Sequence, residues 1–77
     1  MSWNYRVVKN YYDEGGEYLA IHEVYYDEEG DPMMCGVLPA DIMGDDADEL
    51  KAVLNMIQQA FDRPVLDYYE DFPNDTE

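Results

Sequence analysis

Hydrophobic and polar residues alternate along the first part of the chain, a pattern typical of β-strands. In residues 3–12 the two alternating sets are Trp3, Tyr5, Val7 and Tyr11 against Arg6, Val8 and Tyr12. A turn sequence, Asp-Glu-Gly-Gly, follows at 13–16, and alternation resumes over 17–26. These features predict a β-hairpin. A second acidic turn at 27–32 leads to a short apolar segment at 32–38, which predicts a third strand.

The pattern changes to helical spacing after residue 45. Asp46 is a suitable N-cap, and Glu49 three residues later completes a capping-box pattern. Pro64 then ends the helix, which is predicted over 46–62. Apolar residues recur every three or four positions and form one stripe: Leu50, Val53, Leu54, Ile57, Ala60 and Phe61.

These elements predict a single α+β domain over residues 1–72 with the order β-β-β-α. The predicted sheet is a three-stranded antiparallel meander (3–12, 17–26 and 32–38), with the helix laid across one face so that the two apolar faces bury each other. Val65 and Leu66 form only a short apolar segment after the helix. The acidic residues at 73–77 are expected to be a flexible tail.

The net charge of the chain limits which partners it can bind. The chain has 77 residues, with nineteen acids against four bases and a net charge of −15, and no base lies between Lys9 and Lys51. Such a charge disfavours direct binding of nucleic acid or an anionic membrane, and it favours a basic protein partner. Aromatic residues make up 14% of the sequence, which indicates a folded chain rather than a disordered acidic one.

Tyrosine pairs next to acids occur three times, at 11–14, 25–28 and 67–71. Two interpretations stay open. Each pair can place one ring in the core and one at the surface, with the acids solvating the turns. Alternatively, exposed rings and acids together form anchors for a basic partner, with strand-spaced acids imitating a row of phosphates. Under the second interpretation the partner-binding residues are Tyr12, Asp13, Glu14, Tyr25, Asp27, Glu28, Glu29, Asp31, Tyr69, Glu70 and Asp71.

Catalytic and metal chemistry have weak signals. His22 and Cys35 are the residues with obvious catalytic potential, and ordinary strand positions explain both, so we expect no enzyme and no cofactor. The acids at 27–31 lack the spacing of a calcium loop, and N-capping explains those at 45–49, so we expect no metal site.

Location can also be predicted from the sequence. One cysteine cannot form an intramolecular disulfide, which fits a reducing compartment. The first six residues do not resemble a signal peptide, and no apolar run approaches the roughly 18 residues of a membrane span. We therefore expect a cytoplasmic protein.

Two resemblances add to this interpretation. The segments SWNYRV (2–7), IHEVYYD (21–27) and PVLD (64–67) resemble a small bacterial and phage family of uncharacterised proteins, which implies no activity. The strand-strand-strand-helix order, with Gly44 to Leu50 opening the helix, is similar to the partial ribonuclease-H-like core of HicB-type antitoxins. In that family this core binds a small toxin, and a separate segment binds DNA. We expect no counterpart of that DNA-binding segment here, and the turn at 39–44 departs from the family pattern.

Three functions follow as hypotheses. The first is a non-enzymatic inhibitor or adaptor that occupies the basic nucleic-acid-binding surface of a partner, as phage anti-CRISPR and anti-restriction proteins do. The second is a toxin-neutralising module that binds through its helix or a sheet edge. The third is a homodimer formed by strand pairing at an open sheet edge.

Overall fold

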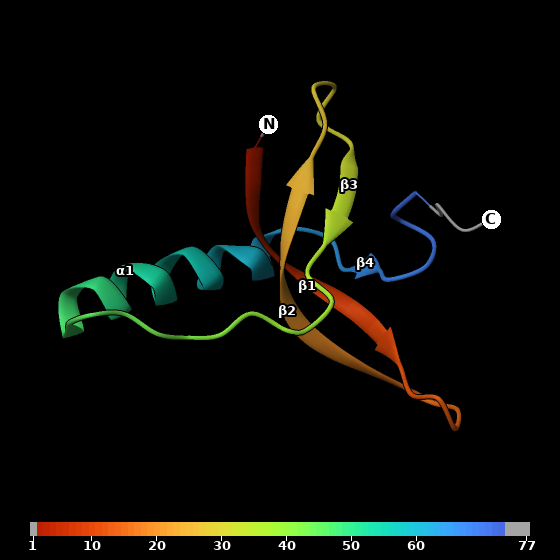
Figure 1. Ribbon diagram of the computed structural model, residues 1–77, viewed down its shortest axis with the longest axis horizontal. Helices are drawn as coiled ribbons and strands as arrows, with labels where there is room; N and C mark the ends of the chain where they lie inside the picture. The colour runs from red at the N-terminus through yellow and green to blue at the C-terminus, as the bar shows by residue number, and fades with distance from the viewer. Residues whose placement is uncertain (1, 74–77) are drawn as a thin grey trace.

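The computed structural model describes residues 2–73 and shows one mixed sheet with one helix beside it (Figure 1). The sheet has the strand order β3-β2-β1-β4. In chain order the elements are β1 (Ser2–Tyr11), β2 (Glu17–Tyr26), β3 (Pro32–Cys35), α1 (Ala47–Gln58), the 3-10 helix η1 (Gln59–Asp62) and β4 (Leu66–Asp67).

The predicted fold, a three-stranded antiparallel meander of order β-β-β-α, is wrong. A fourth strand follows the helix, so the order is β-β-β-α-β and the sheet is mixed. β4 runs parallel to β1, with Val8 opposite Leu66 and Lys9 opposite Asp67. Two residues carry no alternation that a sequence pattern can reveal, and parallel pairing joins segments far apart in the chain. Leu66, the second residue of the predicted apolar segment at 65–66, is therefore part of the sheet, whereas Val65 precedes β4 and is exposed.

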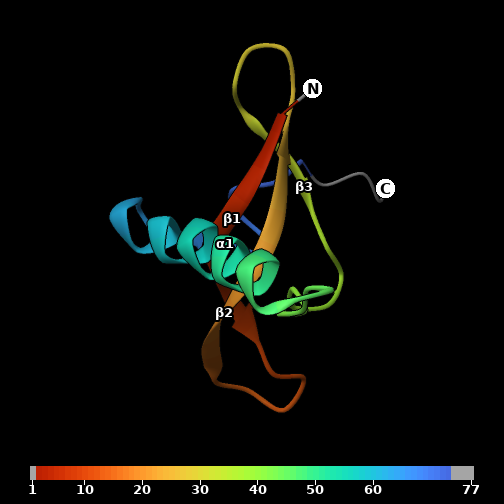
Figure 2. The same ribbon diagram turned by 90° about the vertical axis from the view of Figure 1, so that its left-hand side faces the viewer.

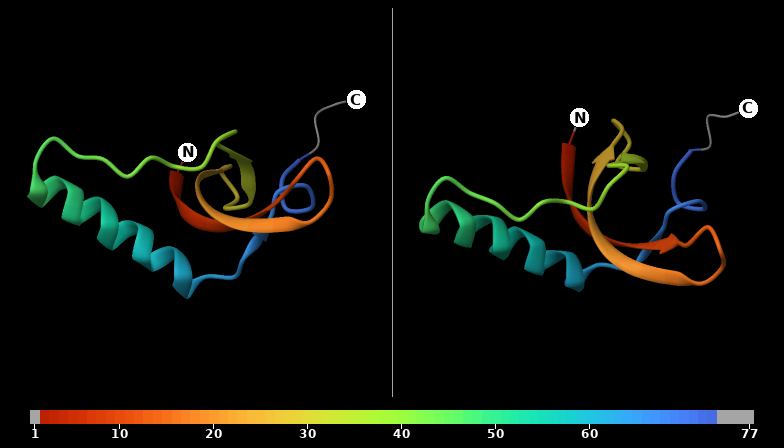
Figure 3. Two further views of the ribbon diagram at one scale, coloured as in Figure 1. Left: turned by 90° about the horizontal axis from the view of Figure 1, so that it is seen from below. Right: turned by 60° about the horizontal axis from the view of Figure 1, so that its bottom comes forward.

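β1 and β2 form a long antiparallel ribbon that curls into an arc (Figure 3). Ten residue pairs are in continuous register, from Ser2 opposite Tyr26 to Tyr11 opposite Glu17. Tyr5 and Val7 are buried on one face of the ribbon, and Val8 is buried on the other. Residues that alternate in the sequence thus lie on opposite faces of the ribbon.

Both faces of the ribbon carry a core, whereas the sequence predicted one. On the helix face, Tyr5 and Val7 pack with Ile57 and Ala60. On the opposite face the cluster is made by Val8, Val24 and Leu66, with Tyr68 and Phe72 packed against it. Figure 1 shows the helix on one side of the ribbon and the C-terminal segment on the other. The residues after the helix therefore cover the second face of the ribbon, which the predicted fold left exposed.

The helix begins at the predicted cap. The Asp46 side chain accepts a hydrogen bond from Glu49 N at 2.8 Å, and Glu49 Oε1 accepts one from Asp45 N at 2.6 Å. The α-helix ends at Gln58, and η1 continues to Asp62, so the predicted span of 46–62 is divided into two helix types.

Only part of the predicted apolar stripe is buried. Ile57 and Ala60 lie in the core, but Leu54 is 45% exposed and Phe61 is 68% exposed. Figure 2 views the molecule from the helix side and shows α1 crossing in front of the β1–β2 ribbon. The ribbon covers one edge of the stripe and leaves the other edge in solvent.

A polar network lies on the second face of the ribbon. The buried Arg6 donates from Nη1 to the Tyr26 hydroxyl at 2.8 Å and from Nη2 to Pro64 O at 2.7 Å. The Tyr26 hydroxyl in turn donates to Asn4 Oδ1 at 2.7 Å. Arg6 therefore ties the segment after the helix to the ribbon.

β3 is shorter than the predicted 32–38, but the chain keeps bonding to β2 beyond it. β3 ends at Cys35, after which Gly36 N donates to Glu23 O at 3.1 Å and Ala40 N to Ile21 O at 2.8 Å. Of the predicted tail, residues 74–77 lie outside the described part of the chain. Neither described helix combines the length and the apolar character needed to cross a bilayer.

Candidate partner-binding surface

The turn between β1 and β2 places the first group of predicted partner-binding residues at a hairpin tip. Tyr12 N donates to Gly16 O, and Gly15 N to Tyr12 O, both at 3.1 Å. Gly15 and Gly16 have φ values of 104° and 94°, a region that residues with a side chain rarely adopt. Asp13 and Glu14 are exposed at the tip, as the partner-binding hypothesis requires.

β4 brings the third tyrosine pair beside the first. Tyr68 N donates to Lys9 O at 3.0 Å, which continues the β1–β4 pairing. The ring of Tyr69 then stacks on that of Tyr11, with 5.2 Å between centroids and 26° between planes. Two tyrosine pairs from opposite ends of the sequence therefore meet at one end of the sheet.

A second ring pair extends this group to the other face of the ribbon. Tyr12 packs on Tyr18 with 4.6 Å between centroids. Tyr18 lies on the same face of β2 as the buried His22. The aromatic rings at this end of the ribbon therefore lie on both of its faces. We call this group the hairpin-end surface, and it comprises Tyr11, Tyr12, Asp13, Glu14, Glu17, Tyr18, Asp67, Tyr69, Glu70 and Asp71.

Carboxylates surround the Tyr11 phenol. Its hydroxyl donates a hydrogen bond to Asp67, and this bond, with partial desolvation and the charges of Asp67, Glu17 and Glu70, raises the pKa of Tyr11 to about 12. The same bond, assisted by two backbone N–H groups and by Lys9, lowers the pKa of Asp67 from its ordinary 3.8. Lys9 Nζ lies 3.8 Å from Glu17 Oε2. The raised pKa means that the Tyr11 phenol holds its proton more tightly than a free tyrosine does.

The acids that follow β4 hold their own turn. Asp67 Oδ1 accepts hydrogen bonds from Tyr69 N at 2.9 Å and Glu70 N at 3.0 Å. Asp71 Oδ2 accepts one from Asp67 N at 2.6 Å. Asp67 and Asp71 thus have a structural role as well as a charge, while Glu70 is exposed.

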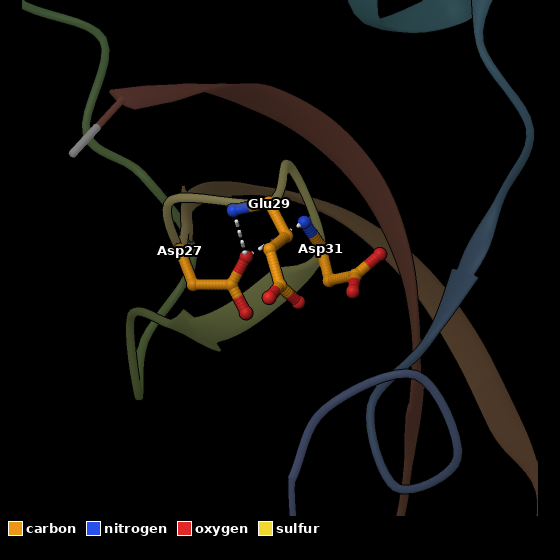
Figure 4. Close-up of side chains that lie close together, drawn as sticks. All are labelled: Asp27, Glu29 and Asp31. Carbon is orange, nitrogen blue, oxygen red and sulfur yellow. Dashed lines mark hydrogen bonds between the residues drawn. The ribbon is translucent and has the colours of Figure 1, made fainter.

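The turn between β2 and β3 holds a separate acidic group, which we call the β2–β3 turn surface (Figure 4). Asp27 Oδ1 accepts hydrogen bonds from Glu29 N at 2.9 Å and Asp31 N at 3.0 Å, and Gly30 takes a φ of 86°. Glu28, Glu29 and Asp31 are exposed, whereas Asp27 is half-buried. These contacts curl the turn around the Asp27 carboxylate.

This turn gathers three possible metal ligands. One carboxylate oxygen from each of Asp27, Glu29 and Asp31 lies within 4.8 Å of the others. Calcium takes about six to eight oxygens, and one oxygen of Asp27 already accepts two backbone hydrogen bonds. Turn formation accounts for the arrangement without an ion.

Tyr25 beside this turn is less available than a partner anchor would be. It is half-buried, its ring lies 6.4 Å from that of Trp3, and its hydroxyl donates to Glu23 Oε1 at 2.8 Å. That hydrogen bond is the largest cause of a raised Tyr25 pKa. The second tyrosine pair therefore belongs mainly to the packing of the sheet.

The predicted binding residues fall into two groups rather than one. The first group is part of the hairpin-end surface: Tyr12, Asp13, Glu14, Tyr69, Glu70 and Asp71. The second group is Tyr25 with the acids of the β2–β3 turn surface: Asp27, Glu28, Glu29 and Asp31. β2, a ten-residue strand of roughly 30 Å, separates the two groups.

His22 and Cys35 have structural surroundings. His22 is fully buried; its Nδ1 lies 2.9 Å from Gly36 O and its Nε2 lies 3.1 Å from Asn10 Nδ2. A carbonyl accepts and an amide NH₂ donates, so the bonding pattern assigns the proton to Nδ1. Cys35 is half-buried against the second core, and burial raises the pKa of its thiol. The histidine thus joins β1 and β2 to the chain that leaves β3.

The sequence prediction missed part of the hairpin-end surface. Tyr11, Glu17 and Tyr18 could have been included from the predicted hairpin alone. Its register places Tyr11 opposite Glu17 and Tyr18 opposite Asn10. Asp67 carried no such signal, since its bond to Tyr11 depends on the two-residue strand β4.

Comparisons with protein-family models, with curated proteins and with solved structures found no match for this chain. The surface chemistry is therefore the basis for assigning a function.

Proposed function

We propose that the protein is a non-enzymatic interaction protein that binds a basic partner protein and covers that partner's nucleic-acid-binding surface. The observation that supports this proposal best is the hairpin-end surface. Tyr12 and Tyr69 are 56% and 65% exposed there, next to acids from both the hairpin tip and the turn after β4. No direct contact with nucleic acid or with a membrane is part of the proposal, because the net charge of −15 opposes both.

The chemistry of this surface suits arginine and lysine side chains. A guanidinium can stack on an exposed tyrosine ring and donate hydrogen bonds to a nearby carboxylate. Surface ion pairs alone contribute about 0–1 kcal/mol and weaken with salt, whereas buried aromatic anchors retain their contribution. The combination of rings and acids at one end of the sheet therefore favours specific binding over general attraction.

The hairpin-end surface is a stronger candidate than the β2–β3 turn surface. Both are acidic, but the tyrosine beside the β2–β3 turn is half-buried and bonded to Glu23. Two variants that each lose three acids, and so each change the net charge from −15 to −12, separate the two surfaces. The hairpin-end variant is Asp13→Asn, Glu14→Gln and Glu70→Gln, and the matched variant is Glu28→Gln, Glu29→Gln and Asp31→Asn.

The experiment captures partners from a bacterial extract on the immobilised chain and then measures the identified partner with each variant. We expect a nucleic-acid-binding protein that DNA or RNA displaces competitively. The hairpin-end variant should raise the Kd at least about tenfold, and the matched variant should raise it much less. Equal weakening by both variants would mean that net charge alone causes binding, and full binding by the hairpin-end variant would refute the assignment of the surface.

Identification of the partner also tests the second hypothesis from the sequence. A small toxin bound through α1, with no competition from nucleic acid, would replace the present proposal with the antitoxin-like one. We further propose a cytoplasmic location, because the single cysteine suits a reducing compartment.

A further inference from the structure

β2 has a strand edge that is only partly paired. β3 pairs with the C-terminal end of β2, at residues 24–26, and the chain that leaves β3 makes its last hydrogen bond to this edge from Ala40 N to Ile21 O, at 2.8 Å. Beyond Ala40 the chain turns away from the sheet toward α1 (Figure 3). Among residues 2–73 nothing pairs with this edge between Glu17 and Ala20, where β1 alone holds β2. We call these four residues the open edge of β2.

The pairing of β2 shows which backbone groups face the open edge. Neighbouring residues of a strand direct their backbone N–H and C=O groups to opposite sides. Since Ile21 O accepts from Ala40, the odd-numbered residues of β2 direct these groups away from β1. The N–H and C=O of Glu17 and Leu19 therefore face outward, and within residues 2–73 they have no hydrogen-bond partner on this side. They offer four backbone bonds to an added strand.

Exposed apolar side chains lie beside these groups. Leu19 is 59% exposed and shares a face of β2 with Ile21, which packs against the core on the helix side. Val37 and Leu38 are 80% and 76% exposed, in the chain that passes this edge between its hydrogen bonds to Glu23 and Ile21. Unpaired strand groups flanked by exposed apolar side chains are typical of a site for strand addition.

Charge selects a basic segment for this edge rather than a second copy of the chain. β2 carries no base, and Glu17 lies on the open edge itself, close to Asp13 and Glu14 at the hairpin tip. Lys9 lies 3.8 Å from Glu17, but neither tip acid has an ion pair among residues 2–73. A second copy of charge −15 would bring like charges together here, whereas arginine and lysine side chains meet opposite charge.

We propose that an extended basic segment of the partner protein adds to the open edge of β2 as a further antiparallel strand. The inference rests on the proposed function, because it describes how the basic partner is held. Both existing strand partners of β2 run antiparallel to it, and this pairing is the more stable one. The residue opposite Leu19 is apolar and packs on Leu19. Its neighbours are basic and lie on the face of Tyr18, where they stack on the ring and meet the tip acids.

Synthetic peptides test this proposal on the unchanged full-length chain. The probe is a capped heptapeptide of alternating arginine and valine, and its control is an isomer with the arginines in one block and the valines in another. Both peptides have the same composition and charge. At about 0.15 M salt the alternating peptide should have a Kd at least about tenfold lower, because only alternation matches the two faces of a strand.

Backbone N-methylation of the probe tests the pairing itself. In the proposed antiparallel strand the valines lie beside Leu19 and direct their N–H groups toward β2, whereas the arginines direct theirs to solvent. N-methylation of the valines should therefore raise the Kd at least about tenfold, and N-methylation of the arginines should change it much less. The two modified peptides keep the same charge and side chains.

Amide hydrogen exchange locates the bound peptide. In the free chain the unbonded Leu19 amide should exchange much faster than the Ala20 amide, which faces β1, and the alternating peptide should slow it at least about tenfold. Leu19→Pro should prevent binding because it removes the outward N–H, and the ladder with β1 has no bond to lose at that position. Leu19→Ala keeps this N–H and should retain most of the binding. Circular dichroism checks the fold of both variants.

The outcomes separate this inference from the proposed function. No binding of the alternating peptide, equal binding of the two isomers, equal effects of the two N-methylations, or an unchanged Leu19 amide overturns strand addition. A captured basic partner that binds Leu19→Pro as tightly as the unchanged chain also overturns it and leaves the proposed function in place. The proposed function fails instead if no captured partner is displaced by DNA or RNA, whatever the peptides do.

Discussion

Replacing Leu66 by alanine and replacing Leu54 by alanine should have very different effects on stability. Leu66 is only 8% exposed and packs with Val8 and Val24, which are both fully buried. Leu54 is 45% exposed on α1. The sequence pattern alone predicts the opposite order of stability losses. It places Leu54 in the apolar stripe of the helix and Leu66 in a short apolar segment after the last predicted element.

The expected magnitudes follow from burial. Leu66→Ala removes three carbon groups at about 0.8 kcal/mol each, or about 2.4 kcal/mol, and the cavity brings the loss to about 3 kcal/mol. A chain of 77 residues has a total unfolding free energy of about 4–12 kcal/mol, so this loss is a large fraction of it. At Leu54 about half of the transfer free energy is at stake, and the better helix propensity of alanine offsets part of it, so the loss should stay below about 1 kcal/mol.

Urea unfolding followed by circular dichroism measures both losses. With a slope of about 1 kcal/mol per molar urea, typical of a small domain, the midpoint should fall by about 3 M for Leu66→Ala and by less than about 1 M for Leu54→Ala. The samples are diluted until the midpoint no longer depends on protein concentration, which removes any contribution from self-association. A loss at Leu54 equal to or larger than that at Leu66 would refute the two-sided core.

Two further predictions concern the hydrogen bonds of Tyr11 and Asp46. Because the folded state raises the pKa of Tyr11 to about 12, it binds more protons than the unfolded state above pH 10, and stability should fall between about pH 10 and 12. Tyr11→Phe should remove this alkaline loss of stability, measured by urea unfolding. It should also let the pKa of Asp67 rise toward 3.8 in carboxyl NMR titrations. An unchanged Asp67 pKa would contradict the hydrogen bond between the two residues. Asp46→Ala should cost about 1 kcal/mol in the same unfolding assay because the Glu49 N–H loses its acceptor, and Asp46→Asn should restore most of it.

The local elements could be predicted because their signals lie within a few neighbouring residues. Ten-residue alternation defines β1 and β2, and the glycines at 15 and 16 define the turn between them. The Asp46 and Glu49 pair defines the start of the helix. None of these features depends on what packs against the element.

The features that were missed depend on pairing between distant segments. β4 has two residues, and its partner in β1 lies 58 positions earlier, from Leu66 to Val8. The stacking of Tyr69 on Tyr11 and the bond from Tyr11 to Asp67 both follow from that pairing. The repeated tyrosine motif was visible in the sequence, but only the topology shows that two copies meet and the third stays apart.

The pattern also could not tell which side of an amphipathic helix is covered. The residues at 50, 54, 57 and 61 have equivalent apolar character, yet only Ile57 is buried. Periodicity reports that a face avoids water, and it carries no information about whether the same chain or another one covers that face.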